Sequence, residues 1–203
     1  MEHWKKRIGD RTDLTTRLVH LTKGAGGDDC IDVLVKILSC KKLNGSTTQS
    51  GFIIGSTPAV CFQDAPVYSV FQNIWFEQKS RELDPKRKRR YSPVGIMLEK
   101  QAVFAKGGRP VIYDESHKAK KYLPKSEWWR IVGFDLANDH RIIDWTHERE
   151  WRIPHSISFE LEDVCLLFAN IQSIKLFEER CKKNGVEHHL KVGGMIPVDN
   201  IAF

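Results

Sequence analysis

The chain has 203 residues, of which 41% are hydrophobic and 29% charged, and its net charge is +6. This composition excludes a wholly disordered or fibrous protein, and no apolar run approaches the ~20 residues that a membrane-spanning helix needs. The N-terminus has no apolar segment behind its charges, so it does not resemble a secretory signal. Five widely spaced cysteines without a C-x-x-C pair predict a reduced, cytoplasmic compartment and no metal site.

The length predicts one domain over residues 1–203. In chain order, its first half alternates short β-favouring runs with apolar residues at helical spacing. These patterns predict, in turn, a strand at Arg17–Thr22, a helix at Cys30–Cys40, strands at Gly51–Ile54 and Ala59–Phe62, and a helix at Val67–Arg81. Asp28 or Asp29 is placed to cap the first helix, and Pro66 opens the second.

The second half continues with shorter elements. The patterns predict a strand at Gly95–Leu98, a helical turn at Gln101–Lys106, a strand at Pro110–Tyr113, helical structure at Glu115–Trp129, strands at Ile131–Leu136, Ile142–Trp145, Glu148–Ile153, Val164–Ala169 and Ile174–Leu176, and a helix at Glu178–Asn184. Many short strands with two to four helices indicate an α+β fold.

The predicted strand over Glu148–Ile153 holds the densest group of charges. Alternation along it puts Glu148, Glu150 and Arg152 on one face, where two carboxylates repel each other and raise one pKa. Such a pair suits proton transfer or stabilisation of a cationic transition state. A solvated face with ion pairs is the alternative, but Trp151 and Ile153 on the other face predict that the strand packs against the core.

The first predicted strand carries a histidine. Alternation places His20 and Thr22 on one face of that strand, with apolar residues on the other. A single histidine in a strand is most often structural. Its functional use would be to position a ligand through hydrogen bonds of the ring.

Several short motifs follow one another along the chain. They are the His20-x-Thr22 strand, a short helix, the Val60–Pro66 sequence, the Gly108–Tyr113 strand and the Glu148-x-Glu150 strand. Over about residues 15–155, this arrangement resembles the ADP-ribosyltransferase superfamily. It is most similar to bacterial proteins related to the DarT-type DNA ADP-ribosyltransferases and to abortive-infection proteins of phage defence that share the Glu-Arg-Glu-Trp-Arg strand.

The resemblance implies a fold, an activity and a setting. The fold would be a split, twisted β-sandwich that clamps NAD in a cleft. The activity would be NAD-dependent mono-ADP-ribosyl transfer to nucleic acid or, less typically, to protein. The setting would be a bacterial toxin or a phage-defence system, with an antitoxin or another defence protein as partner.

The resemblance also implies roles for particular residues. His20, with Thr22 beside it, would position the nicotinamide ribose. Glu150 would bind that ribose and stabilise the oxocarbenium-like transition state, while Glu148 would orient or activate the acceptor. From its place after Gly107-Gly108, Arg109 is predicted to contact either a phosphate or Asp114. The chain departs from the family in having no clear Ser-Thr-Ser triplet, and the ring that stacks on nicotinamide has four candidates: Phe62, Tyr113, Tyr91 and Tyr68.

Five consecutive cations form a basic segment. They are Lys86, Arg87, Lys88, Arg89 and Arg90. Such a run is usually a solvated loop, but with the family resemblance it predicts a contact with the nucleic-acid backbone.

Two other functions fit the same residues. A metal-dependent nuclease would draw oxygen ligands for magnesium from Asp135, Asp144, Glu148 and Glu150. The chain lacks the lysine that restriction-type nucleases carry beside their acidic strand. A non-catalytic module of the same fold would instead use the basic segment to bind nucleic acid or a partner.

Overall fold

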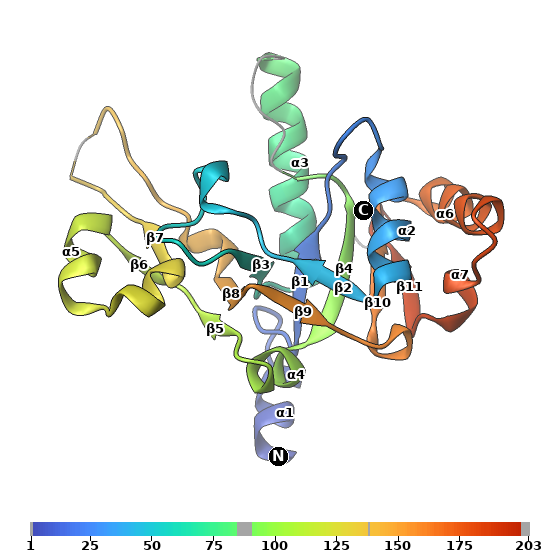
Figure 1. The fold of residues 1–203 in the computed structure, drawn as a ribbon, viewed down its shortest axis with the longest axis horizontal. Helices are drawn as coiled ribbons and strands as arrows, with labels where there is room; N and C mark the ends of the chain where they lie inside the picture. Colours follow the sequence, from blue (N-terminus) through green and yellow to red (C-terminus); the bar gives the residue numbers. More distant parts are fainter. Residues whose placement is uncertain (1, 85–90, 138, 200–203) are drawn as a thin grey trace.

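The structure is a computed structural model that describes residues 2–84, 91–137 and 139–199 (Figure 1). The basic segment 86–90, predicted to contact nucleic acid, lies outside the described residues. The α-helices are α1 (Glu2–Gly9), α2 (Cys30–Cys40), α3 (Val67–Leu83), α4 (Lys100–Ala105), α5 (Ser116–Tyr122), α6 (Ile171–Lys183) and α7 (His188–Lys191). The 3-10 turns are η1 (Thr48–Ser50), η2 (Lys125–Arg130), η3 (Thr146–Glu148) and η4 (Leu161–Asp163). The strands are β1 (Arg17–Leu21), β2 (Lys42–Asn44), β3 (Ala59–Gln63), β4 (Val94–Glu99), β5 (Arg109–Pro110), β6 (Ile112–Asp114), β7 (Ile131–Gly133), β8 (Glu150–Pro154), β9 (Ser156–Ser158), β10 (Cys165–Phe168) and β11 (Gly194–Pro197).

One mixed sheet organises the fold, in the strand order β11-β10-β4-β1-β3-β8-β5. Only β10 and β11 run parallel within it, and the pairs β2–β9 and β6–β7 form two small further sheets. Strands β3 and β8 pair over their whole length, ending with Gln63 opposite Glu150. Strands β1 and β3, in contrast, share the single pair Val19 and Gln63. The sheet is therefore continuous, but β1 and β3 diverge beyond this pair.

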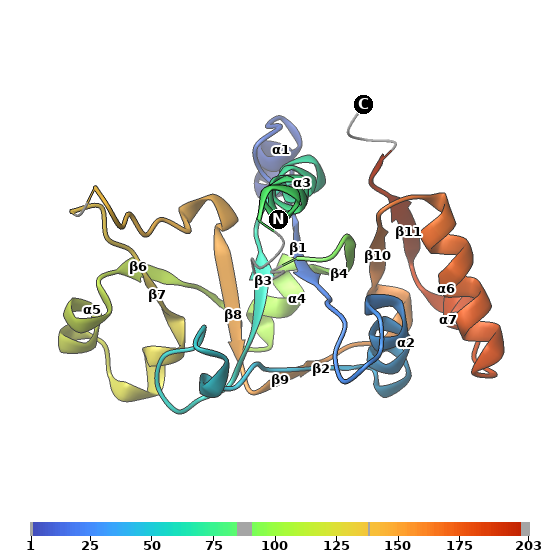
Figure 2. The ribbon, with the colours of Figure 1, turned by 90° about the horizontal axis from the view of Figure 1, so that it is seen from above.

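The core lies on both faces of the sheet, as α+β composition predicts. On one face, Leu18 and Phe62 belong to a large cluster that includes the apolar sides of α2 and α6. On the other face, Val19 packs with Val70 and Ile74 of α3. Figure 2 shows α2 and α6 beside β10 and β11, whereas α3 lies near β1 and β3. Alternate residues of β1 therefore point into two different clusters, as strand geometry requires.

The first predicted helix is confirmed with its boundaries. Asp29 is its N-cap, and its carboxylate accepts hydrogen bonds from the backbone N–H groups of Ile31 at 2.8 Å and Asp32 at 2.9 Å. These bonds satisfy two amides that have no partner within the helix. The four apolar residues that predicted the helix are all buried: Ile31, Leu34, Val35 and Leu38.

Three predicted strands are wrong. The stretch 51–54 forms bends, with Gly51 and Gly55 at φ of +78° and +91°, which interrupts extended structure. Within 142–145, only Ile143 makes a β-bridge, to Asp135. The stretch 174–176 lies inside α6, because Asn170 caps that helix through the N–H of Ser173 at 2.9 Å.

No helix among the described residues is long and apolar enough to cross a membrane.

Candidate functional site

Strand β8 begins at Glu150, not at Glu148 as predicted. Glu148 ends the 3-10 turn η3, and Arg149 follows with a left-handed φ of +45°. The chain changes direction between the two glutamates, so they do not share a strand face. The predicted pair of adjacent carboxylates on one face is therefore wrong, and the two residues have different surroundings.

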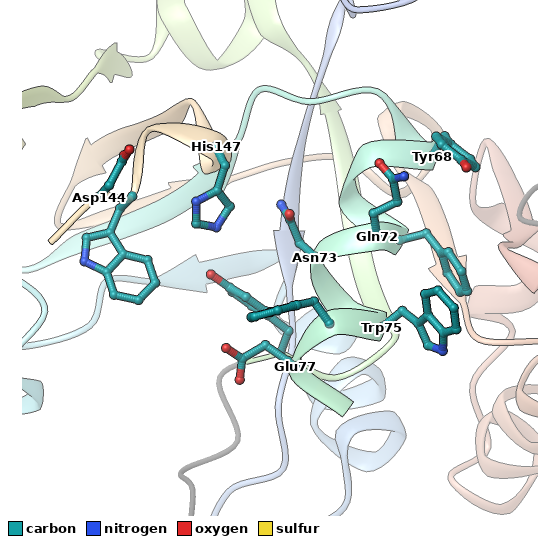
Figure 3. A pocket seen from close by; sticks show the side chains of 11 residues that line it. Tyr68, Gln72, Asn73, Trp75, Glu77, Asp144 and His147 are labelled. Carbon is teal, nitrogen blue, oxygen red and sulfur yellow. The ribbon is translucent and has the colours of Figure 1, made fainter. Parts of the chain in front are cut away.

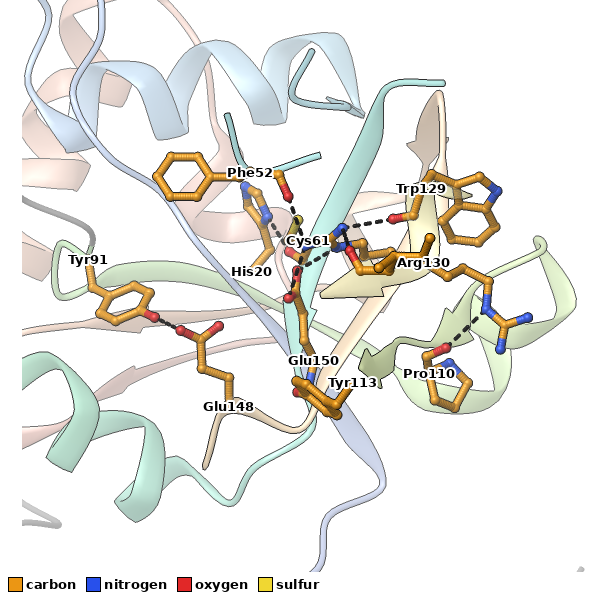
Figure 4. Close-up of polar contacts among 12 residues, drawn as sticks. His20, Phe52, Cys61, Tyr91, Pro110, Tyr113, Trp129, Arg130, Glu148 and Glu150 are labelled. Carbon is orange, nitrogen blue, oxygen red and sulfur yellow. Dashed lines mark hydrogen bonds and ion pairs between the residues drawn. The ribbon is translucent and has the colours of Figure 1, made fainter. Parts of the chain in front are cut away.

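Glu150 and Arg152 form a buried ion pair with relative exposures of 7% and 3%. The Arg152 Nε and Nη2 groups donate to the two carboxylate oxygens at 2.8 and 3.2 Å (Figure 4). Its Nη1 donates to the carbonyls of Trp129 and Ile131, and its Nη2 also donates to the carbonyl of Phe52. All five guanidinium N–H groups thus have an acceptor. The pair joins β8 to η2, β7 and the loop after η1.

Two more groups surround this ion pair. The Tyr113 hydroxyl oxygen accepts the backbone N–H of Glu150 at 2.8 Å, and burial raises the pKa of Tyr113 to about 12. Burial and the nearby Glu150 raise the pKa of the Cys61 thiol well above its ordinary value. Both groups therefore stay protonated at neutral pH. Tyr113, predicted as a candidate for ring stacking, holds the start of β8 through its hydroxyl.

Glu148 lies at a different place, beside Tyr91 in the segment that leads into β4. The Tyr91 hydroxyl donates a hydrogen bond to Glu148 Oε1 (Figure 4). Glu148 is half-buried, whereas Glu150 is almost fully enclosed. Glu148 is therefore oriented by a neighbouring hydroxyl and retains access to solvent.

A cavity of about 650 Å³ lies between α3 and the segment 144–147, and Tyr91, the partner of Glu148, is part of its lining (Figure 3). We call it the α3 cavity. Its lining consists of Tyr68, Phe71, Gln72, Asn73, Trp75, Phe76, Glu77, Tyr91, Asp144, Trp145 and His147. This volume is in the range of small-molecule sites. The lining combines six Phe, Tyr and Trp rings and the His147 imidazole with two carboxylates, and no lysine or arginine of the described residues belongs to it.

Along the cavity, helix α3 exposes large aromatic side chains and buries a carboxylate. Trp75 and Phe76 are 44% and 64% exposed, whereas Glu77 is 5% exposed. Glu77 Oε2 is buried and has no hydrogen-bond partner among the described residues. One turn earlier, the Asn73 amide donates to Gln63 Oε1 at 3.3 Å. Exposed rings beside a buried carboxylate distinguish this helix from an ordinary packing helix.

On the opposite wall, Asp144 closes a local turn. Its Oδ1 accepts hydrogen bonds from the hydroxyl and the backbone N–H of Thr146, at 2.6 and 2.8 Å. These bonds lower the pKa of Asp144, so this carboxylate stays ionised at neutral pH. The rings of Trp145 and His147 lie 5.9 Å apart at the same wall.

His20 lies on the other face of the sheet. Val19, Gln63 and Glu150 are cross-strand partners and share one face, so His20 and Phe62 share the opposite face. The two rings meet edge to face at 5.9 Å. His20 Nδ1 lies 2.9 Å from the Cys61 carbonyl and must donate, because a carbonyl only accepts. Burial lowers the His20 pKa. Cys61 is also the residue whose thiol lies beside Glu150, so His20 reaches the surroundings of the Glu150–Arg152 pair through Cys61 (Figure 4).

The other predicted ligand residues are dispersed. Phe62 is fully buried in the core, so its ring has no face open to a ligand. Thr22 is also buried, and its hydroxyl has no partner among the described residues. Arg109 lines a second cavity of about 390 Å³ that includes Pro154 and His155, at the far end of β8 from Glu148. Its guanidinium lies 4.0 Å above the Phe104 ring.

Sequence reasoning missed the residues of the α3 cavity, apart from Tyr68, Tyr91 and Asp144, the last of these named only as a metal ligand. The signal for one of them was present, because Val70, Ile74 and Glu77 follow one another at helical spacing. A glutamate in that apolar series marks a buried carboxylate. Nothing local marks Asp144, Trp145 and His147 as the second wall, since their position depends on the end of β8.

The described residues offer no set of ligands for a metal ion. Within the described parts of the chain, no group of three histidine, cysteine, aspartate or glutamate residues lies close enough to hold an ion. Asp135, Asp144, Glu148 and Glu150, the ligands of the alternative nuclease prediction, do not form such a group. Comparisons of the chain with family models, with curated proteins and with solved structures each gave no match.

Proposed function

We propose that this chain is an NAD-dependent mono-ADP-ribosyltransferase in which Glu148 is the carboxylate that stabilises the reacting ribose. The observation that carries the proposal is that Glu148 accepts a hydrogen bond from Tyr91 and directly follows His147, two residues that line the α3 cavity. The split sandwich of that family agrees with the divergence of β1 and β3.

The chemistry requires one accessible carboxylate. When nicotinamide leaves NAD, positive charge develops on the ribose, and a nearby carboxylate stabilises it as in glycoside cleavage. Glu150 is less suited to this role than expected, because both of its oxygens are occupied by Arg152 in a buried pair. We therefore assign the transition-state role to Glu148 and a positioning role to Glu150.

The acceptor of the ADP-ribosyl group is proposed separately from the role of Glu148. Nucleic acid was expected from the basic segment 86–90 and from the family resemblance. The aromatic lining of the α3 cavity also suits a flat ring or base.

The test is incubation of the purified protein with labelled NAD and, in separate reactions, single-stranded DNA, duplex DNA, RNA or bacterial protein. Nicotinamide release and label transfer are measured for the wild type and for Glu148→Gln. We expect the variant to lose about 10²- to 10³-fold in rate, as other enzymes do when one charge-stabilising group is removed. Glu187→Gln, an exposed glutamate on the turn before α7, is the matched control and should retain full activity.

Two results would overturn the assignment. Full activity of Glu148→Gln would show that this carboxylate does not act on the ribose. Absence of both nicotinamide release and transfer with every acceptor would remove NAD as the substrate.

A further inference from the structure

The α3 cavity has a carboxylate that lacks a partner inside the protein. Glu77 Oε2 is buried without a hydrogen bond among the described residues, on a side chain that is 5% exposed. A buried acceptor of this kind costs stability unless something donates to it. Figure 3 shows Glu77 and Asn73 on the side of α3 that faces the 144–147 wall. Because the Glu77 side chain lines the cavity, a donor on a ligand bound there would offset part of this cost.

The charges of the lining define which ligand fits. Two carboxylates, Glu77 and Asp144, line the cavity, and no described lysine or arginine does. Among the described lining residues, His147 is the one side chain that can carry a positive charge, against two carboxylates, although the whole chain is basic. The cavity therefore favours a positively charged group.

The aromatic walls define its shape. The faces of Trp and Tyr rings attract cations, and planar groups stack on them with the largest contact area. The protein itself uses such a contact on the side of α3 away from Glu77, where Lys79 Nζ lies 3.9 Å from the centroid of the Trp75 ring (Figure 3). The amide side chains of Gln72 and Asn73 add acceptor and donor groups beside the rings.

We propose that the α3 cavity binds a planar organic cation that carries N–H donors, with Glu77 as its counter-charge. Two chemical groups have these properties: the pyridinium ring of an oxidised nicotinamide with its carboxamide, and the guanidinium of an arginine side chain. The first source rests on the proposed function, because it would be the leaving end of NAD next to Glu148. The second would belong to a protein or peptide.

The cation preference has a consequence for the reaction. Cleavage of the glycosidic bond leaves the bonding electron pair on the ring nitrogen and converts the charged ring into neutral nicotinamide. The neutral product no longer has the charge that Glu77 attracts, so it binds more weakly than the ring of the substrate. The cavity thus favours the substrate and releases the product.

The test is isothermal titration calorimetry of the purified protein with two matched pairs of small molecules. 1-Methylnicotinamide is compared with neutral nicotinamide, and methylguanidine with neutral urea. We expect one cation to bind at least tenfold more tightly than its neutral counterpart, and the pair that shows this preference identifies the source. Equal affinity within both pairs, or tighter binding of inorganic phosphate or AMP than of either cation, would overturn the proposal.

The variant Glu77→Gln tests the role of the carboxylate. It keeps the size of the side chain and should weaken cation binding about 10- to 100-fold, as for other hydrogen bonds to charged groups. Glu82→Gln, the same exchange at an exposed position of α3, should bind like the wild type. Thermal unfolding checks that Glu77→Gln is folded, and we expect it to melt close to the wild type because the two side chains have the same size. Unchanged cation binding in Glu77→Gln would refute the inference.

These measurements need neither turnover nor an acceptor. Cation binding without NAD cleavage would contradict the proposed function and leave the binding site intact. NAD cleavage without a cation preference would support the proposed function and contradict the cation site.

Discussion

The buried ion pair between Glu150 and Arg152 gives the sharpest stability prediction. Replacing Glu150 with alanine leaves a guanidinium that is 3% exposed, without a counter-charge and without two of its five acceptors. Breaking a buried pair from one side typically costs about 3–5 kcal/mol of unfolding free energy. For a chain of this length, each kcal/mol lowers the melting temperature by roughly 2–4 °C, so we expect a decrease of roughly 6–20 °C.

The assay is thermal unfolding followed by circular dichroism, with Glu160→Ala as the control. Glu160 pairs with Lys41 at 2.6 Å, but these side chains are 66% and 48% exposed. Water solvates an exposed glutamate after its partner is lost, so the control should melt like the wild type. The double variant Glu150→Leu, Arg152→Met should recover part of the loss, because no charge stays buried. A Glu150→Ala decrease no larger than that of the control would refute this reasoning.

Two further predictions concern the helix cap and the histidine. Asp29→Ala should lower the unfolding free energy by about 1 kcal/mol in a urea titration, because the Ile31 and Asp32 amides lose their acceptor; no change would show that water replaces the cap. Burial lowers the His20 pKa in the folded state below its ordinary 6.5, so the unfolded chain binds more protons and stability falls as the pH drops below about 6.5. His20→Gln should lose less stability between pH 7 and 5.5 than the wild type, and an equal loss would assign the effect to other groups such as His188, whose pKa burial also lowers.

The parts of the fold with strong local signals could be predicted from the sequence. Helix α2 has both an apolar stripe and a capping aspartate, and helix α3 follows a proline, so both were located correctly. The run Ile174–Leu176 is β-favouring by itself, but Asn170 caps a helix four residues earlier and tertiary packing buries Ile174 and Phe177. Local preference is outweighed there by a cap and by burial.

The site was harder to predict than the fold. The strand pattern identified Glu148 and Glu150, but it could not reveal the left-handed turn at Arg149 that separates them. It also placed His20 among the ligands, although only the register of Val19 with Gln63 decides which face His20 occupies. Register is a long-range property, so alternation within one strand leaves the choice of face open.

The position of β4 in the sheet has a consequence for biosynthesis. β4 is buried from Val94 to Leu98 and pairs with β1 on one side and with β10 on the other. β10 is synthesised after nearly all the other strands, so a nascent chain that has β1 and β4 still presents one long apolar edge. Such an edge pairs readily with other chains, so we expect the incomplete chain to be prone to aggregation until Cys165–Phe168 covers the edge.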